Sequence, residues 1–475
     1  MKKLALILTL VVITACAPRE VIYPLFGMDV PRLHAFPKDF SATISNETGL
    51  PVGGFGGGGG GVNRVPVIFV HGNTVSANFW LPARQYFKDK GYTGDELWAP
   101  SYGWNSVRAF DTADLSVPTL EAFVNQVQNY LTEKTGRPVR QVDVIGHSLG
   151  VTLVRQWMMQ ENAWHRVRNF VGAAGANDGV WTARADARGQ NRVVAFELYP
   201  GSPWLKQLRR GGDTPGPTRY MTLYDGTGWG DVLFPKPYEH AGALQGAKNV
   251  AYNVEHGTYY DHLELPRVPE TMDEMIQFFD EEPQPLPQAE PPRLVRAPDS
   301  VRANQPDAQV FCETGGRYPS RATAGITEFT LNDDTLATCF ARGTTSGLSS
   351  PMARYQRKDA YASDAALTLT ATPAGGVYEQ PQSVALSTSD PDAFIVYTTG
   401  GSRPNSGSPL YTEPVFISGP VKLTAVAITP DGRQSEPLVL NYDISLELLD
   451  TRHSLQRQFD AEAPSMYRGK RKKGN

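Results

Sequence analysis

The segment Gly146-His147-Ser148-Leu149-Gly150 constrains the fold of this chain more than any other feature. It has the pattern G-x-S-x-G, follows an apolar run at residues 142–145 that predicts a buried strand, and precedes a stretch at 151–160 that predicts a helix. Such a strand-turn-helix elbow holds the serine side chain out at the top of a sheet, and small flanking residues permit the strained turn. The pattern therefore predicts Ser148 as a nucleophile.

Short apolar runs alternate with helical patterns on both sides of this motif. Strands are predicted at 65–70, 97–99, 142–145, 167–172, 219–224 and 249–254, and helices at 79–90, 120–131, 151–160 and 270–279. This alternation is typical of βαβ units, in which crossover helices cover a mostly parallel sheet. Residues 63–281 are thus predicted to form an α/β domain with helices on both faces of its sheet.

Acyl transfer to a serine also requires hydrogen-bond donors for the oxyanion that develops on the substrate. The segment Val70-His71-Gly72-Asn73 ends the first predicted core strand, where folds with this elbow place their first oxyanion loop. We expect the backbone N–H groups of Asn73 and Leu149 to be the two donors. His71 precedes the nucleophile, so we interpret it as a residue that orients this loop rather than as the catalytic base.

The general base and its acid follow the serine in chain order, as serine, acid and then histidine. This order leaves His240, His256 and His262, and His262 is favoured over His256 because it begins the loop that leads to the last predicted helix. The acid is expected after the strand at 219–224, where Asp225 and Asp231 both occur. Spacing alone barely separates these two carboxylates.

Several segments resemble bacterial lipases of the α/β-hydrolase superfamily, particularly lidless or short-lid lipases and extracellular polyester depolymerases. They are residues 70–73, 146–150, 202–208, 213–216 and 220–224 with the loop up to Asp231. The resemblance implies the α/β-hydrolase fold and a serine esterase or lipase activity. In the family pattern the acid maps onto Asp231 and the histidine onto His262, although the Gly-rich stretch 225–230 departs from that pattern.

The N-terminus has the features of a targeting signal. Lys2 and Lys3 precede an apolar run at 4–13 that is too short to span a bilayer permanently. The following Ile13-Thr14-Ala15-Cys16 resembles the bacterial lipobox, which implies a signal peptide at 1–15 and lipidation of Cys16. We expect a membrane-anchored envelope protein, with ordinary secretion as the alternative. Residue 17 is not Asp, which by resemblance to enterobacterial lipoprotein sorting favours the outer membrane over the inner. Residues 16–62, which end in a glycine run, are interpreted as a tether.

The rest of the chain is predicted to carry accessory units. A Pro-rich spacer at 282–292 precedes a small segment at 293–362, where Cys312 and Cys339 form an even pair and predict a disulfide in an oxidising compartment. Alternating strands at 363–446 predict an all-β sandwich. Residues 375–378, 395–404, 408–411 and 423–427 resemble the chitobiase or β-hexosaminidase C-terminal module, with Gly400-Gly401 in place of the usual Asp-Gly. A basic tail occupies 447–475.

These features lead to a ranked set of functions. The net charge of −4 argues against a nucleic-acid binder, and no residue cluster has metal-ligand spacing, so neither a metal nor a cofactor is predicted. The first hypothesis is an envelope lipase or esterase acting on lipid or polyester substrates. The alternatives are a polyhydroxyalkanoate-type depolymerase that holds its polymer through the C-terminal module, and a non-catalytic glycan-binding lipoprotein. Four tryptophans are candidates for the substrate cleft: Trp80, Trp104, Trp181 and Trp229.

Overall fold

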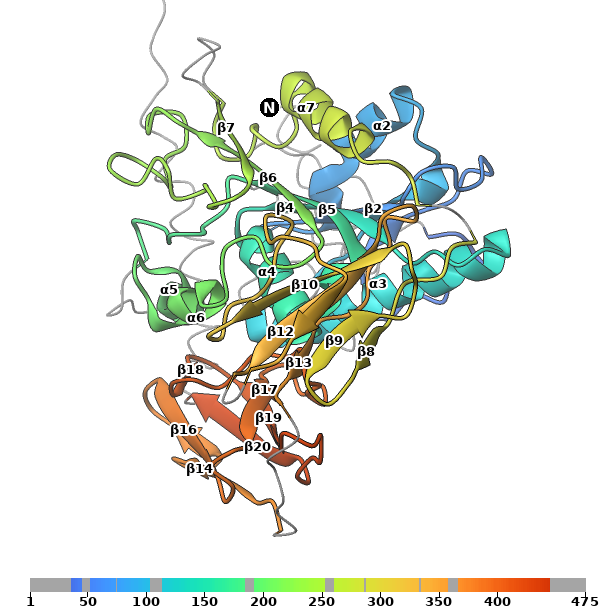
Figure 1. Ribbon diagram of the computed structural model, residues 1–475. Coiled ribbons are helices and arrows are strands. Elements are labelled where there is room, and N and C mark those ends of the chain that lie inside the picture. The colour runs from blue at the N-terminus through green and yellow to red at the C-terminus, as the bar shows by residue number, and fades with distance from the viewer. Residues whose placement is uncertain are drawn as a thin grey trace, which may run out of the picture.

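The computed structural model describes residues 36–44, 52–73, 75–102, 113–183, 192–252, 260–285, 288–332, 335–357 and 366–444. It contains an α/β-hydrolase domain, a small β-rich unit and a β-sandwich, which follow one another along the chain (Figure 1). Cys16, Trp104, His256 and the basic tail lie outside the described residues. None of the helices within these ranges is long and apolar enough to cross a lipid bilayer.

The hydrolase domain is built on one seven-stranded sheet in the order β1-β3-β2-β4-β5-β6-β7. Its strands are β1 (Gly54–Phe55), β2 (Val67–Val70), β3 (Leu97–Ala99), β4 (Val142–His147), β5 (Val167–Ala173), β6 (Arg219–Asp225) and β7 (Lys248–Tyr252). Strands β2 to β7 are parallel, while β1 pairs antiparallel with β3 at the edge. All six strands predicted from apolar runs are present, and β2 to β5 are buried on both faces, as expected for a covered parallel sheet.

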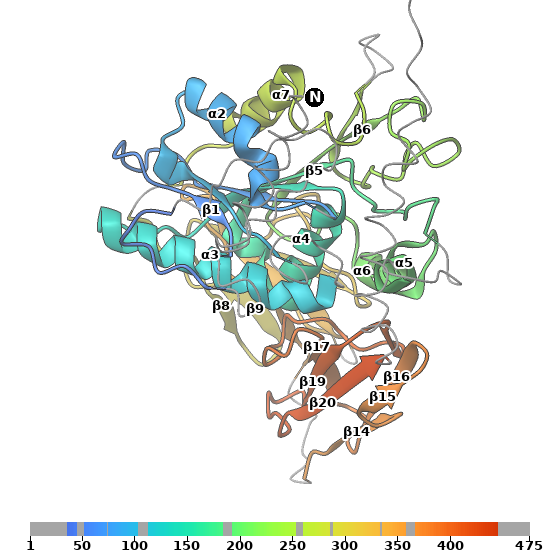
Figure 2. The ribbon, with the colours of Figure 1, turned by 180° about the vertical axis from the view of Figure 1, so that it is seen from behind.

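Helices cover both faces of this sheet, as Figures 1 and 2 show from opposite sides. On one face α2 (Leu81–Asp89) packs against α7 (Pro269–Asp280), and on the other α3 (Ala113–Thr135) packs against α4 (Leu149–Gln160). Both α2 and α7 carry proline in the first turn, where no intrahelical N–H bond is lost. The shorter helices are η2 (Ala77–Trp80), η3 (Gly94–Glu96), η4 (Ala163–Arg166), α5 (Arg192–Leu198) and α6 (Pro203–Arg209).

The strand order places the ends of β2 and β4 side by side. After β2 the chain moves to β3 on one side, and after β3 it crosses to β4 on the other side of β2. Open α/β sheets bind their ligands beside the carboxyl ends of the strands at such a reversal. The loop that follows β2 and the turn that follows β4 therefore lie next to each other at this edge of the sheet.

The glycine run does not match the predicted tether. Gly54 and Phe55 form β1 on the sheet edge, and Gly57 donates its backbone N–H to Asp95 Oδ1 at 2.9 Å. Gly56 lies directly on the Trp98 ring, where an added Cβ would stand 2.7 Å from Cζ2 and would not fit. The absence of side chains here allows the main chain to pack on an indole, so these glycines close the sheet edge rather than act as a loose linker.

The start of the Pro-rich segment is also docked on the hydrolase domain. Arg168 of β5 donates to the main-chain carbonyl of Glu282 at 2.9 Å, and the backbone N–H of Val65 donates to Gln284 Oε1 at 2.9 Å. The Glu282 carboxylate pairs with Arg321 and Arg342 of the next unit. The first residues of the predicted spacer are therefore bonded to the units on both sides of it.

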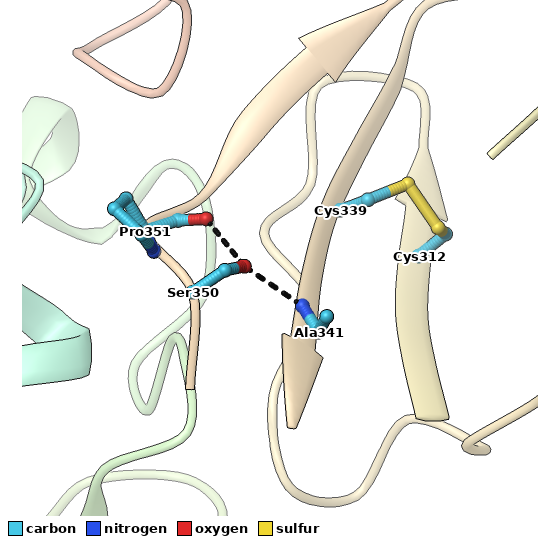
Figure 3. Close-up of a disulfide and its surroundings, with 5 residues drawn as sticks. All are labelled: Cys312, Cys339, Ala341, Ser350 and Pro351. Carbon is cyan, nitrogen blue, oxygen red and sulfur yellow. Dashed lines mark hydrogen bonds between the residues drawn. A yellow bond between two sulfur atoms is a disulfide. The ribbon is translucent and has the colours of Figure 1, made fainter. Parts of the chain in front are cut away.

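Residues 293–357, for which the sequence predicts little beyond a disulfide, form two small sheets. The strands are β8 (Leu294–Arg296), β9 (Ser300–Ala303), β10 (Ala308–Thr314), β11 (Glu328–Thr330), β12 (Ala337–Gly343) and β13 (Ala353–Tyr355). Cys312 and Cys339 are direct partners across β10 and β12 and form the predicted disulfide (Figure 3). Nearby, the Ser350 hydroxyl accepts from the Ala341 N–H and donates to the Pro351 carbonyl, which fixes the chain beyond β12.

The β-sandwich closes the described chain with two sheets, ordered β14-β16-β18 and β15-β20-β19-β17. Its strands are β14 (Leu369–Thr372), β15 (Gly376–Tyr378), β16 (Gln382–Thr388), β17 (Phe394–Thr398), β18 (Val415–Ile417), β19 (Val421–Ile428) and β20 (Leu438–Ile444). Inward residues of both sheets form a separate apolar core. The β-rich unit lies between the hydrolase sheet and the sandwich in both views (Figures 1 and 2).

The sandwich also contacts the hydrolase domain directly, at the C-terminal end of α4. The backbone N–H of Thr399 donates to Gln160 Oε1 at 2.7 Å, and Asn162 Nδ2 donates to Asn405 Oδ1 at 3.1 Å. Asn162 also bonds to the main chain of Met352 in both directions. The three units thus meet around Asn162, at the opposite end of α4 from Ser148.

Candidate active site

Ser148 occupies the elbow that the sequence predicts. Strand β4 ends at His147, α4 begins at Leu149, and Ser148 between them has φ 55° and ψ −123°. A positive φ is costly for a residue with a Cβ and is maintained only where the surrounding structure imposes it. Within the motif Ser148 alone is partly exposed. Gly150 permits the tight turn, because a Cβ there would lie 2.6 Å from the Val70 carbonyl oxygen.

His262 and Asp231 form a hydrogen-bonded pair. His262 Nδ1 lies 2.7 Å from Asp231 Oδ2, and their side chains are 12% and 1% exposed. A carboxylate accepts at this distance, so Nδ1 carries the proton and Nε2 is left as the basic nitrogen. His262 stands in the turns between β7 and α7, and Asp231 in the loop after β6.

Asp225, the other predicted candidate for the acid, has different partners. Its carboxylate accepts from the backbone N–H and hydroxyl of Thr227 and from the backbone N–H groups of Gly230 and Asp231, at 2.7–3.0 Å. Asp225 therefore organises the loop that carries Asp231. The Gly-rich stretch that departs from the family pattern supplies this loop's main-chain donors, a role that the sequence analysis did not assign.

The loop that carries His262 is hydrogen-bonded to His147, the residue before Ser148. His147 Nε2 donates to the His262 carbonyl at 2.8 Å, and the two imidazole rings lie 4.8 Å apart. Among the described residues, the hydrogen bonds of His262 do not include one with Ser148 Oγ. Catalytic hydrogen bonds are often long or poorly aligned without substrate and shorten only when it binds.

The predicted oxyanion loop lies against the elbow. Gly72 faces Ser148 so closely that an added Cβ would stand 2.8 Å from the Ser148 Cβ. Asn73 follows in the same loop and is partly exposed, whereas Leu149 is the first residue of α4. The N–H groups of the first helical turn have no intrahelical acceptors, and the helix dipole favours negative charge at this position. Both predicted donors thus lie on the segments that flank Ser148.

His71 has the geometry of an orienting residue. Its Nδ1 donates to the Gly72 carbonyl at 2.8 Å, and its Nε2 accepts the backbone N–H of Tyr102 at 3.2 Å. The Tyr102 ring stacks on the imidazole at 4.1 Å. Complete burial lowers the pKa of His71 from 6.5 to about 4, so the ring is neutral near pH 7. Both ring nitrogens are therefore used to fix the loop after β2.

Two of the four candidate tryptophans lie at the surface near Asp231. Trp229 is 75% exposed, Val232 is 73% exposed and Trp181 is 42% exposed. The Trp181 indole N–H donates to the Val232 carbonyl at 3.0 Å, so Trp181 lies beside the segment that carries Trp229 and Val232. We refer to these three exposed residues as the apolar patch. Trp80, by contrast, is fully buried in the hydrolase core and lies outside this surface. Across the described ranges, no group of three or more His, Cys, Asp or Glu side chains is arranged to hold a metal ion.

Comparison with protein families identifies two regions. Residues 64–208 match the class 2 lipase family. This part of the chain is therefore similar to class 2 lipases. Ser148 and both predicted oxyanion donors fall within the matched residues, while Asp231 and His262 follow them along the chain. Residues 373–439 match the chitobiase/β-hexosaminidase C-terminal domain, as the resemblance of the sandwich segments implied.

Solved structures with a similar arrangement of elements include bacterial lipases. The mature form of the Bacillus licheniformis lipase BlEst2 is 17% identical, covers 47% of this chain and 96% of its own, and has a TM-score of 0.36. Its propeptide form is 13% identical, with coverages of 81% and 95% and a TM-score of 0.35. The Legionella pneumophila phospholipase PlaB is 13% identical, with coverages of 60% and 85% and a TM-score of 0.31. The comparison with curated proteins gave no match.

Proposed function

We propose that this protein is a serine carboxylic ester hydrolase in which Ser148 is the nucleophile, His262 the general base and Asp231 the acid. The observation that carries the proposal is the hydrogen bond from His262 Nδ1 to Asp231 Oδ2, beside an elbow that holds Ser148 at positive φ. This bond selects the imidazole tautomer whose Nε2 can accept a proton.

The reaction proceeds through an acyl-enzyme. His262 Nε2 takes the proton of Ser148 as its Oγ attacks the ester carbonyl carbon, and the N–H groups of Asn73 and Leu149 stabilise the oxyanion. The tetrahedral intermediate collapses, and the alcohol leaves with the proton from His262. Water, deprotonated by His262, then attacks the acyl carbon and releases the acid and free Ser148. Asp231 stabilises the imidazolium in both steps.

The proposed substrates are lipid esters presented at a water interface. The patch of Trp181, Trp229 and Val232 supports this choice, because it exposes large apolar side chains next to the residue that pairs with His262. An exposed apolar patch beside a catalytic site favours contact with an apolar surface over contact with a small soluble substrate. Tryptophan is well suited to such an interface, since one end of its ring is apolar and the other polar.

A polymeric ester is the second candidate substrate. The chitobiase/β-hexosaminidase C-terminal domain supports it, since this sandwich is held against the hydrolase domain through Gln160 and Asn162 and could keep a polymer close to the enzyme. We further propose that lipid on Cys16 anchors the protein in the bacterial envelope, on the basis of the lipobox-like segment that ends in Cys16.

Two measurements on the purified protein test the proposal. A fluorophosphonate probe is expected to label Ser148, and the protein is expected to hydrolyse p-nitrophenyl esters over a series of acyl lengths. Ser148→Ala should abolish the labelling and lower kcat by at least about 1,000-fold. A folded protein that is neither labelled nor active on any ester would contradict the proposed function. Comparing emulsified triglyceride with polyester films would then separate the two substrates.

A further inference from the structure

His147, the residue before the proposed nucleophile, is buried at the end of β4 and bonded to the histidine loop. Its side chain is only 1% exposed, and its Nε2 lies 2.8 Å from the main-chain oxygen of His262. A carbonyl oxygen can only accept, so Nε2 carries the proton of a neutral imidazole. His147 Nδ1 is buried and, among the described residues, has no hydrogen-bond partner. The polar contact of this ring is therefore directed at His262.

Packing fixes the orientation of the His147 ring. Phe79 stacks on it with ring centres 4.8 Å apart and an interplanar angle of 12°. Gly72 leaves room for Nδ1, because an added Cβ at that glycine would lie 3.0 Å from it. The Arg267 guanidinium lies over the Phe79 ring, 4.5 Å from the ring centre, and its Nε donates to the Leu263 carbonyl at 2.9 Å. The elbow and the histidine loop are thus linked through one rigid aromatic cluster.

His262 depends on such support because it lies in a succession of turns, with no regular element to hold its main chain. Its side chain is fixed by Asp231, and its carbonyl is fixed by His147. Since His147 is covalently joined to Ser148, the second bond sets the distance between the serine and the histidine loop directly. A displacement of about 1 Å at a reacting group can cost about 100-fold in rate.

We infer that His147 is a positioning residue, which holds the main chain of His262 through its Nε2–H and thereby keeps the catalytic imidazole within reach of Ser148. This inference rests on the proposed function. The groups facing His147 are the basic side chains of His262, His71 and Arg267. A neutral His147 adds no further positive charge when His262 becomes protonated during the reaction.

Three substitutions test this role in the full-length protein. His147→Gln keeps an N–H donor that can reach the His262 carbonyl, His147→Asn has a donor that is too short, and His147→Phe keeps a ring without a donor. For Asn and Phe we expect kcat on p-nitrophenyl butyrate to fall about 10- to 100-fold, with KM changed by less than about 3-fold. Gln should restore kcat to within about 5-fold of the parent.

The matched control is His165, which also bonds through a ring nitrogen to a main-chain carbonyl, that of Asn162 at 3.1 Å, but at the far end of α4. His165→Phe should lower the melting temperature and leave kcat unchanged. The inference is wrong if folded His147→Asn and His147→Phe keep the parent kcat, or if His147→Gln is as slow as His147→Asn. If His147→Phe does not fold, the comparison of His147→Gln with His147→Asn decides the question. A parent that is inactive and unlabelled at Ser148 contradicts the proposed function itself, together with this inference.

Discussion

Asp231 Oδ2 and His262 Nδ1 lie 2.7 Å apart, although 31 residues separate them in the chain. If this carboxylate holds the imidazole in its productive tautomer, Asp231→Asn should lower kcat by roughly 10,000-fold, since an amide can stabilise the wrong tautomer. Steady-state hydrolysis of a soluble p-nitrophenyl ester measures the effect. An unchanged melting temperature would show that the loss is catalytic.

Asp225 provides the matched comparison for this prediction. Its carboxylate accepts four hydrogen bonds within the loop that ends at Asp231, so Asp225→Asn should mainly cost stability, about 1–3 kcal/mol. We expect its kcat to remain well above that of Asp231→Asn. The opposite ranking of the two variants would make Asp225 the functional acid and contradict the proposed roles.

The free energy of unfolding should decrease as the pH is lowered below neutrality. Burial lowers the pKa of His71 from 6.5 to about 4, so the unfolded chain binds a proton in this interval that the folded chain does not. The stability that His71 contributes is therefore complete above pH 6.5 and is lost as the pH falls toward 4. In His71→Asn the slope between pH 5 and 6 should decrease by about 1.1 kcal/mol per pH unit, as urea titrations at each pH would show. An identical slope in both proteins would refute this assignment.

Much of the hydrolase fold could be predicted from the sequence because its signals are local. The run predicted at 97–99 became β3 with the same bounds, and the run at 142–145 lies within β4, since each is a continuous apolar stretch next to turn residues. The elbow was predicted equally well, since its glycines and its strand-helix context all lie within a short segment. The disulfide followed from counting cysteines in a compartment where a pair is expected to be oxidised.

Features that depend on long-range contacts were not predicted. The glycine run reads as a tether, yet Gly56 packs on Trp98, and only the folded chain brings these two together. The short strands β8, β9 and β11 lack a clear periodicity because each has only three or four residues and is only partly buried. In the site, spacing in the sequence barely separated Asp225 from Asp231 as candidates for the acid. It also gave no reason to relate His147 to the His262 main chain. Both questions depend on distances between loops, which the sequence does not contain.

The junction at Asn162 is expected to stabilise the whole chain. Asn162 has the left-handed backbone angles φ 52° and ψ 40°. Its side chain forms two hydrogen bonds with the main chain of Met352 and one with the side chain of Asn405. Asn162→Ala should lower the free energy of unfolding by roughly 3 kcal/mol, because it removes these bonds and places alanine in the left-handed region. Asn162→Gly, which tolerates that region, should lose about 1 kcal/mol less. Urea denaturation checks both values, and ester hydrolysis below the transition should be unchanged. Equal stability of the parent and the alanine variant would argue against this junction.

The last prediction concerns the apolar patch beside Asp231. If Trp229 inserts into a lipid surface, Trp229→Ser should weaken binding to emulsified ester by about 10-fold, from the loss of roughly 1.5 kcal/mol of apolar burial. Hydrolysis of a soluble short-chain ester should be nearly unchanged, because the side chain is 75% exposed and does not support the fold. Val377 on the sandwich is 66% exposed and serves as the control, since Val377→Ser removes apolar surface far along the chain from the site. A Trp229→Ser variant that loses activity equally on soluble and emulsified esters would place Trp229 in the acyl site instead of at the lipid interface.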